Sequence, residues 1–385
     1  MYMEITFWVC LGLVAYIYVG YFAGVRLLAS ILNRNVNKAD IEPSITVVIS
    51  AFNEEREIES TVVNKLSQDY PSDRLEVIVV SDGSTDRTDE IVRSLVDSSK
   101  GRLKFFRQEP RQGKTQALNM AVGHTSAEIA VFADANSIYA PGAIRSLVRN
   151  FADPSIGYVT GQMVYANSAE SGISAGSGSY MSYENELRKL ETRLGSIVGV
   201  DGGIDAIRRQ LYVPMHQDQL PDFVLPLSVI EQGSRVVYEP NAVVYESALS
   251  NAVGEFKMRV RVSLRAMWAL YDKRQLLNPF RYPLFSWQLV SHKVLRYGAF
   301  LPLAGLLVSN ILAMGQDAFY TWFLIVQVVA YAVAMAGHFL QRSSGITAKL
   351  LAPYYFVILN VACVLAFWKF LTGQKIILWK PRLGG

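Results

Sequence analysis

Carboxylates, amides and hydroxyls gather directly behind three apolar runs of the chain. The stretches AFNEE (51–55), SDGSTD (81–86) and FADAN (132–136) each close such a run. Their side-chain oxygens can ligate a hard cation, accept hydrogen bonds from a ribose or a base, or cap a following helix. A polar cluster at the end of a buried strand is a place where α/β proteins bind ligands. The three stretches therefore predict a ligand site.

The elements that would position these stretches follow from the hydrophobic pattern. Short runs rich in β-branched residues alternate with segments of helical spacing. The runs are 45–50, 75–80, 103–106 and 129–132, and the helical segments are about 56–68, 87–97 and 115–122. This alternation predicts an α/β domain with a mostly parallel sheet. Because ligands lie beyond the carboxyl ends of such strands, the polar stretches should converge.

Four other stretches carry no charged residue: 5–25, 297–316, 318–341 and 350–368. Each is long enough to cross an apolar layer about 30 Å thick, which needs roughly 20 residues. The first lacks a positive leader and a small-residue cleavage site, so it is interpreted as a retained anchor and not as a signal peptide.

Basic residues flank the membrane stretches on the side of the globular region. Arg26, Arg34 and Lys38 follow the first stretch, and many lysines and arginines precede the second. The positive-inside rule therefore predicts a cytoplasmic globular region. We expect an integral protein of a bacterial inner or plasma membrane, with membrane lipids among its partners.

Bulk composition agrees with a membrane protein. Hydrophobic residues make up 51% and charged residues 18% of the chain, which is more apolar than an ordinary soluble protein. Both cysteines, Cys10 and Cys363, lie in apolar stretches, so no disulfide framework or zinc site is expected. The net charge of +4 comes from membrane-flanking segments. We interpret it as a membrane-surface feature and expect no nucleic-acid partner.

These observations predict an organisation in four parts. They are an N-terminal anchor at 1–27, a globular domain at 40–250, interfacial amphipathic helices at 251–296 and a C-terminal region of about three spans at 297–385. Four spans would leave the basic end of the chain outside, although it carries Lys369, Lys375, Lys380 and Arg382. Either this end folds back or one segment is not a span, and the sequence leaves both open.

The order AFNEE, SDGSTD, GKTQALN, FADAN and VDGGIDAIRR resembles the inverting, membrane-bound glycosyltransferases of family 2. Within that family the chain is similar to the synthases of poly-N-acetylglucosamine, chitin oligosaccharide, hyaluronan and cellulose. The resemblance covers roughly residues 40–265. It implies a GT-A-type, Rossmann-like domain, a UDP-sugar donor, a glycan or lipid-linked acceptor, and a divalent cation, Mg²⁺ or Mn²⁺.

The resemblance also implies roles for single residues on the donor side. It places Glu54 and Asp82 at the nucleoside, and Lys114 could face a phosphate. Each has a structural alternative: the acids of AFNEE cap the next helix, SDGSTD is a plain strand-to-helix turn, and Lys114 is a solvated surface lysine.

FADAN takes the place of the family's Asp-x-Asp, whose carboxylates hold the cation and the donor diphosphate. Asp134 matches the first acid, and Asn136 replaces the second. An amide oxygen still ligates a hard cation but offers less charge. We therefore expect a weak metal site at Asp134 and Asn136.

Inverting transfer needs a base that takes the proton of the acceptor hydroxyl. The family's acidic motif matches the stretch LPDFVL (220–225), which makes Asp222 the expected base. The alternative is that Asp222 is a turn or cap residue after Pro221. In that case the next candidates are Asp201, Asp205 and Asp218.

The family's Gln-Arg-x-Arg-Trp motif aligns with MRVRV (258–262), so Arg259 or Arg261 is expected at the diphosphate. The Gln and the Trp are absent, which puts processive polymerisation in doubt. Alternatively, this basic run lies on anionic lipid headgroups. Tyr183 and Asp201 are expected on the acceptor side, although core packing is the commoner meaning of aromatic residues at helical spacing.

The sequence thus predicts a membrane glycosyltransferase that moves N-acetylglucosamine or glucose from a UDP-sugar with inversion. One rival is an enzyme that loads a sugar onto a polyprenyl phosphate. Another is a weakly catalytic glycan-export or scaffold protein, suggested by Asn136 and the missing Trp. Metal-dependent UDP-sugar hydrolysis would separate an enzyme from a scaffold.

Overall fold

The computed structural model describes residues 2–165, 172–246, 252–340 and 352–376, and these residues form two compact units. The sheet unit comprises Leu32–Ala166, Asn185–Ser247 and Ile376–Gly385, and the helical unit comprises Met1–Ile31, Asn167–Glu184 and Ala248–Lys375. Helix α7 (Gly172–Leu194) contributes residues to both. Each unit is described here by itself.

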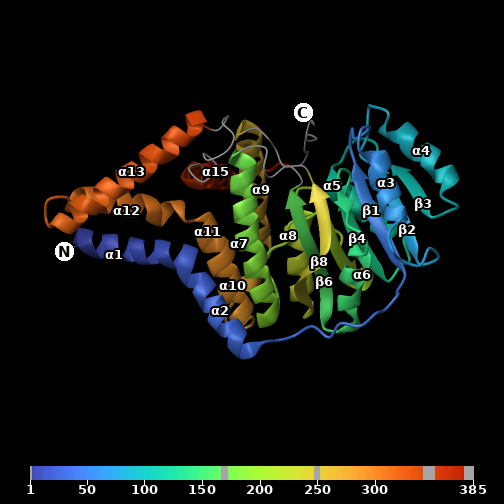
Figure 1. Ribbon diagram of the computed structural model, residues 1–385, viewed down its shortest axis with the longest axis horizontal. Coiled ribbons are helices and arrows are strands. Elements are labelled where there is room, and N and C mark those ends of the chain that lie inside the picture. The colour runs from blue at the N-terminus through green and yellow to red at the C-terminus, as the bar shows by residue number, and fades with distance from the viewer. Residues whose placement is uncertain (1, 166–171, 247–251, 341–351, 377–385) are drawn as a thin grey trace. The chain divides into compact units, whose positions relative to one another are not determined.

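The sheet unit is built on an eight-stranded sheet with the order β3-β2-β1-β4-β7-β6-β8-β5 (Figure 1). The strands are β1 (Ile45–Ala51), β2 (Leu75–Ser81), β3 (Leu103–Arg107), β4 (Ile129–Asp134), β5 (Ile138–Tyr139), β6 (Ile156–Tyr165), β7 (Ile204–Arg208) and β8 (Arg235–Glu246).

Strands β1 to β4 pair in parallel, as the hydrophobic pattern predicts. All seven residues of β1 are buried. A strand that is covered on both faces is typically a nearly continuous apolar run, and this explains the composition of β1. The connecting helices also lie where helical spacing predicts them. They are α3 (Ile58–Leu66), α4 (Thr88–Ser98) and α5 (Lys114–Gly123). The expected α/β architecture is confirmed.

The other half of the sheet is mixed. Strand β7 runs antiparallel to both β4 and β6, β5 runs antiparallel to β8, and β6 and β8 are parallel. The helical elements of this half are α6 (Ala143–Val148), the 3₁₀ turns η2 (Arg149–Ala152) and η3 (Arg209–Leu211), and α8 (Pro221–Glu231). The sheet is therefore parallel where the polar stretches follow the strands and mixed beyond β4.

Strand register aligns the ends of the three central strands. Ser50 of β1 lies beside Asp134 of β4, and Ala51 of β1 lies beside Ser81 of β2. AFNEE, SDGSTD and FADAN consequently leave the sheet at one edge, as the parallel order requires.

The helical unit contains most of the apolar length of the chain. Its elements are α1 (Tyr2–Ala15), the π-helical turn η1 (Tyr16–Gly20), α2 (Tyr21–Leu32), α9 (Ala252–Asp272), the 3₁₀ turn η4 (Arg274–Leu277), α10 (Pro283–Leu289), the π-helical turn η5 (Val290–Val294), α11 (Leu295–Tyr297), α12 (Phe300–Ala313), α13 (Ala318–Leu340) and α15 (Ala352–Leu371).

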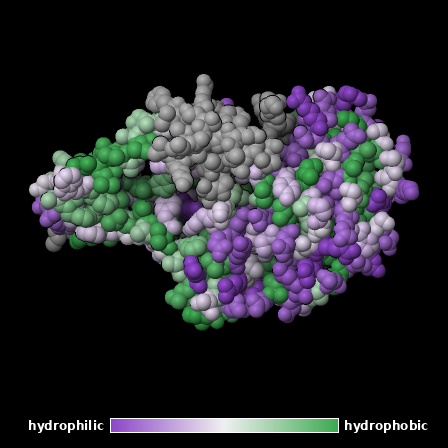
Figure 2. Space-filling view, viewed as in Figure 1, coloured by the Kyte–Doolittle hydropathy of each residue, from purple (hydrophilic) through white to green (hydrophobic). Residues whose placement is uncertain are grey.

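Three helical stretches in the described part are long and apolar enough to cross a membrane: Tyr2–Leu32, Ala318–Gly337 and Pro353–Leu371. They correspond to the expected first, third and fourth spans. Figure 2 shows hydrophobic side chains covering the α1, α12 and α13 region, whereas the sheet unit presents a largely hydrophilic face. This contrast is what a lipid-facing and a water-facing surface require.

The expected span at 297–316 has different boundaries. The chain there forms two helices, Pro283–Tyr297 and Phe300–Ala313, bent by 58°. A helix of 14 residues is about 21 Å long, too short to cross about 30 Å of hydrocarbon. Together the pair lies along the first span: Trp287 Nε1 donates to the hydroxyl of Tyr16 at 2.9 Å, and Leu306 belongs to the apolar cluster of Phe7. A bent pair of this kind is either a broken span or a re-entrant loop.

Gly161 lies where the β6–β8 register is irregular, between Thr160 and Gln162. A Cβ built on it would stand 2.2 Å from the backbone oxygen of Ala242. Gly161→Ala should therefore lower the free energy of unfolding by about 2 kcal/mol or more, the scale of overpacking in a core. Gly123→Ala, where nothing lies within 4 Å of the new Cβ, is the matched control and should leave stability unchanged or slightly raised. Chemical denaturation of both variants in detergent measures the difference, and equal stabilities would contradict the packing.

Candidate functional site

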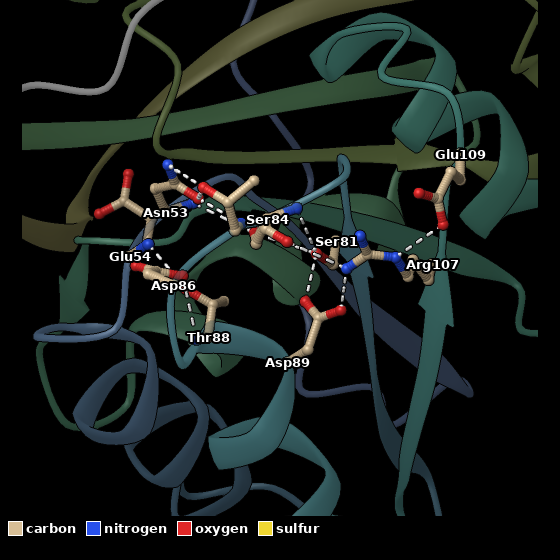
Figure 3. Close-up of polar contacts among 10 residues, drawn as sticks. Asn53, Glu54, Ser81, Ser84, Asp86, Thr88, Asp89, Arg107 and Glu109 are labelled. Carbon is tan, nitrogen blue, oxygen red and sulfur yellow. Dashed lines mark hydrogen bonds and ion pairs between the residues drawn. The ribbon is translucent and has the colours of Figure 1, made fainter.

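Hydrogen bonds join the loop that follows β1 to the loop that follows β2 (Figure 3). The backbone N–H of Asn53 donates to Ser84 Oγ over 3.1 Å, and Asn53 Oδ1 accepts the N–H of Thr85 at 2.8 Å. The N–H of Glu54 donates to Thr88 Oγ1 at 2.8 Å. Asn53 has a φ of 55°, a left-handed conformation that asparagine tolerates. AFNEE and SDGSTD therefore form one rigid surface.

Arg107, at the end of β3, lies beside Ser81, Ser84 and Asp89 (Figure 3). Its guanidinium pairs with Asp89, donates to Ser84 O at 3.1 Å and contacts Glu109 Oε2 at 3.1 Å. Ser81 Oγ also donates to Asp89, over 2.5 Å. The turn after β2 is thus fixed by charge-assisted hydrogen bonds. No motif signalled this arginine in the sequence.

Asp82 is fully buried, and donors of the segment after β3 occupy its carboxylate. It accepts the backbone N–H groups of Gln112 at 2.8 Å and Gly113 at 2.9 Å. It also accepts Gln108 Nε2 at 2.6 Å and Arg111 Nε at 3.1 Å. This carboxylate fixes the loop that leads into α5. Its expected contact with the nucleoside stays a prediction.

Lys114, the first residue of α5, stands between two carboxylates. Its Nζ lies 2.6 Å from Asp134 Oδ1 and 3.7 Å from Asp222 Oδ1. Burial alone would lower the pKa of Lys114, but these two carboxylates outweigh it and hold the pKa above its usual range. The side chains of Asp134 and Asp222 are 33% and 28% exposed, so both remain open to a ligand.

Asp222 sits in the first turn of α8, behind Pro221. The residue at the N-cap position is Leu220, and no side chain caps this helix. The carboxylate of Asp222 instead lies close to Gly202, where an added Cβ would stand 3.0 Å from it. With a φ of 81°, Gly202 also needs the freedom of glycine. Asp222 is therefore directed toward the VDGG loop and Lys114.

Helix α3 holds the FADAN turn by side chains that the sequence analysis did not single out. Asn64 Oδ1 accepts the N–H of Tyr139 at 2.8 Å, and Lys65 Nζ donates to Ser137 O at 2.5 Å. Lys65 is fully buried and lies 3.8 Å from the centroid of the Tyr139 ring. Burial lowers the pKa of Lys65 to about 7. The available signal was a lysine on the apolar stripe of a helix, next to Leu66.

Within the described ranges, no group of three or more His, Cys, Asp or Glu side chains could hold a metal ion. Asp134 and Asn136 are both partly exposed at the end of β4. One carboxylate and one amide fit a hard cation that takes its other ligands from phosphates and water, as Mg²⁺ commonly does. They do not make a closed cage.

Asp201 is engaged by an arginine. Arg188 of α7 forms two hydrogen bonds to its carboxylate and donates through Nε to Gly199 O at 3.2 Å. The side chains of Arg188 and Asp201 are nearly buried. Such a bidentate pair fixes the loop before β7, and an acceptor role for Asp201 stays a prediction. Among the other candidates for the base, Asp218 lies 3.6 Å from His216, and Asp205 is buried.

Three of the expected site residues belong to the helical unit. The ring of Tyr183 lies 5.4 Å from that of Phe22. Arg259 of α9 donates to Glu255 Oε1 at 2.8 Å and to the hydroxyl of Tyr355 on α15 at 2.7 Å. Arg261 is partly buried on the same helix. These contacts join helices of one unit, and donor or acceptor roles for the three residues stay predictions.

Residues 46–213 match the family model described as glycosyl transferase family 2. An N-acetylglucosaminyltransferase of Rhizobium meliloti is 29% identical over 217 residues, which cover 52% of this chain and 50% of that protein. A beta-monoglucosyldiacylglycerol synthase of Nostoc sp. is 29% identical over 170 residues, covering 44% and 36%. A poly-beta-1,6-N-acetyl-D-glucosamine synthase of Staphylococcus epidermidis is 24% identical over 244 residues, covering 60% and 58%. The chain spans about half the length of these curated relatives.

The fold is also found over nearly the whole chain in a solved structure. The mannosyltransferase PcManGT from Pyrobaculum calidifontis, in complex with GDP-Man and Mn²⁺, superposes with a TM-score of 0.71 at 22% identity. The match covers 97% of this chain and 99% of that one, which confirms the expected GT-A-type fold. The chain is therefore similar to glycosyl transferase family 2 over residues 46–213, and its GT-A-type domain is joined to helices long and apolar enough to cross a membrane.

Proposed function

We propose that this protein transfers a sugar from a UDP-sugar, with inversion, to a glycan or lipid-linked acceptor at the membrane. The donor would be UDP-N-acetylglucosamine or UDP-glucose. One observation carries the proposal: Lys114 stands between Asp134 and Asp222, and both carboxylates are partly exposed at the ligand-binding edge of a GT-A-type sheet.

The arrangement contains both a carboxylate that can act as the base and a positive charge that can stabilise the leaving group. Asp222 would take the proton of the acceptor hydroxyl while its oxygen forms a bond to the anomeric carbon. As the bond from that carbon to the diphosphate breaks, the electron pair leaves with the diphosphate, and the ammonium of Lys114 would stabilise its charge. Lys114 remains protonated because Asp134 and Asp222 raise its pKa.

Asp134 and Asn136 would hold a divalent cation together with the diphosphate. When bound, this cation would neutralise charge on the leaving group. The donor set of one carboxylate and one amide supports a cation that arrives with the donor. The rigid AFNEE–SDGSTD surface would face the nucleoside, with Glu54 partly exposed there.

The choice of sugar rests on the relatives. An N-acetylglucosaminyltransferase, a poly-beta-1,6-N-acetyl-D-glucosamine synthase and a beta-monoglucosyldiacylglycerol synthase all match this chain over part of their length. Their names support N-acetylglucosamine or glucose, and they leave both a glycan and a lipid as acceptor. PcManGT was solved with GDP-Man, so a guanosine donor belongs in any test.

We expect purified protein in lipid nanodiscs with Mg²⁺ or Mn²⁺ to consume UDP-N-acetylglucosamine or UDP-glucose in preference to GDP-mannose. Asp222→Asn should lower transfer by at least roughly a hundredfold, because an amide cannot take the acceptor's proton. UDP affinity should stay nearly intact. Turnover and calorimetric UDP binding decide the matter together. Near-normal turnover of the variant would remove Asp222 as the base, and consumption of GDP-mannose alone would remove the uridine donor.

Asn136 provides a test of the cation site. If an amide is the poorer ligand, Asn136→Asp should lower the metal concentration needed for half-maximal activity several-fold. Asp134→Ala is the companion variant and should abolish turnover while the protein still folds in detergent. Metal titrations of initial rate measure both. A metal requirement that stays the same or rises in Asn136→Asp would count against this residue as a ligand.

Membrane sidedness is tested by thiol labelling. We propose that the sheet unit faces the cytoplasm, because basic residues flank the membrane helices on its side. With Cys10 and Cys363 replaced by serine, Ser98→Cys on the exposed end of α4 should resist an impermeant maleimide in intact cells and react after lysis. Labelling in intact cells would show that the sheet unit faces the outside of the cell and would contradict the proposal.

A further inference from the structure

The polar residues Asp134 of β4, Asp205 of β7 and Thr160 of β6 lie on the same face of the sheet. Phe132 of β4 lies opposite Asp205 of β7, and Asp205 lies opposite Thr160 of β6. Opposed residues share a face of a sheet, and so do residues two positions apart on a strand. Asp134, two residues after Phe132, is therefore a diagonal neighbour of Asp205. The carboxyl of Asp205 belongs to the same face as the carboxylate that pairs with Lys114.

Asp205 occupies a place that disfavours a charge. It is 1% exposed, and its Oδ1 has no hydrogen-bond partner among the residues that the structure describes. A buried carboxyl with an unsatisfied oxygen favours its neutral form. Burial and then the negative charge of Asp222 raise the pKa of Asp205 well above its usual range, against the opposing effects of Thr160 and Lys114.

Charged and titratable groups on several elements interact with Asp205. They are Asp222 on α8, Lys114 on α5, Asp201 before β7, Tyr158 on β6 and Tyr139 on β5. Lys114 supplies the positive charge of this set, and it already faces two carboxylates. A third ionised carboxyl would add negative charge where an anionic diphosphate has to bind.

We propose that Asp205 is a positioning residue of the sugar-transfer site that works in its protonated form. Before the donor and its cation bind, two carboxylates and one ammonium then leave one net negative charge around Lys114, where an ionised Asp205 would leave two. Asp222 remains the basic carboxylate, and Lys114 can still attract the diphosphate. This role rests on the proposed function, because it takes Asp222 as the base.

Protonation can be tested without any substrate. A carboxyl with an unfolded pKa of about 3.9 and a higher folded pKa releases its proton on unfolding, so it makes stability fall as pH rises between the two values. Asp205→Asn removes this dependence. Its apparent melting temperature should therefore gain on the wild type as the pH is raised from 5 toward 8, by up to about 2–4 °C for each pH unit below the folded pKa.

Asp201→Asn is the control for this measurement. It removes a carboxylate that is already paired with Arg188, so it should lower the melting temperature by a similar amount at every pH in that range. A constant difference between Asp205→Asn and the wild type would mean that Asp205 is ionised in the fold, and the proposal would be overturned.

Two substitutions at the same position test the positioning role. Asp205→Asn keeps a neutral polar group of the same shape and should lower kcat only a few-fold. Asp205→Val is also uncharged and of similar size, so it too should lower kcat only a few-fold, with KM for the donor and calorimetric UDP affinity little changed.

The remaining outcomes are separable. A loss of kcat in either variant as large as that in Asp222→Asn would overturn the positioning role. If the wild type transfers no sugar from any donor, the proposed function fails. The positioning role then falls with it, whereas the melting measurements still decide whether Asp205 carries a proton.

Discussion

The placement of one ammonium group between two carboxylates is the constraint on which the rest of the site depends. Lys114 brings together Asp134 from the end of β4 and Asp222 from the start of α8, which are 88 residues apart in the chain. Without that cation the two acids would repel each other. The sheet, the loop before α5 and the left-handed Gly202 all serve to keep these three groups in reach of one another.

Local pattern was enough to predict the parallel half of the sheet, because β1, β2 and β4 are mostly apolar, buried runs closed by polar turns. It was not enough for β6, β7 and β8, whose pairing joins segments far apart in sequence and whose apolar pattern is interrupted by Gly161. The family resemblance pointed to Asp134, Asn136 and Asp222 because they stand in sequence motifs. Lys65 and Arg107 stand in no such motif and were missed. Their roles come from partners on other elements, which no spacing along the chain reveals.

The apolar stretch after residue 297 is less regular than expected, for a related reason. Hydropathy counts apolar residues and does not detect a bend, so this stretch looked like one straight helix. In the structure helix α10 begins at Pro283, and the helical segments on either side of Gly298 are bent by 58°. The π-helical turn η5 lies just before that bend, and Ser291 within it is hydrogen-bonded to the hydroxyl of Tyr16 over 2.7 Å. Polar groups at such an irregularity need partners, because lipid supplies none.

The burial of Asp82 has a consequence for how cheaply the site can bind a ligand. Four donors from the segment 108–113 converge on one carboxylate that water does not reach. A loop tied in this way has already lost its conformational entropy on folding, so a ligand that docks against it does not have to order it. A buried residue such as Asp82 can therefore raise the affinity for a ligand without touching that ligand.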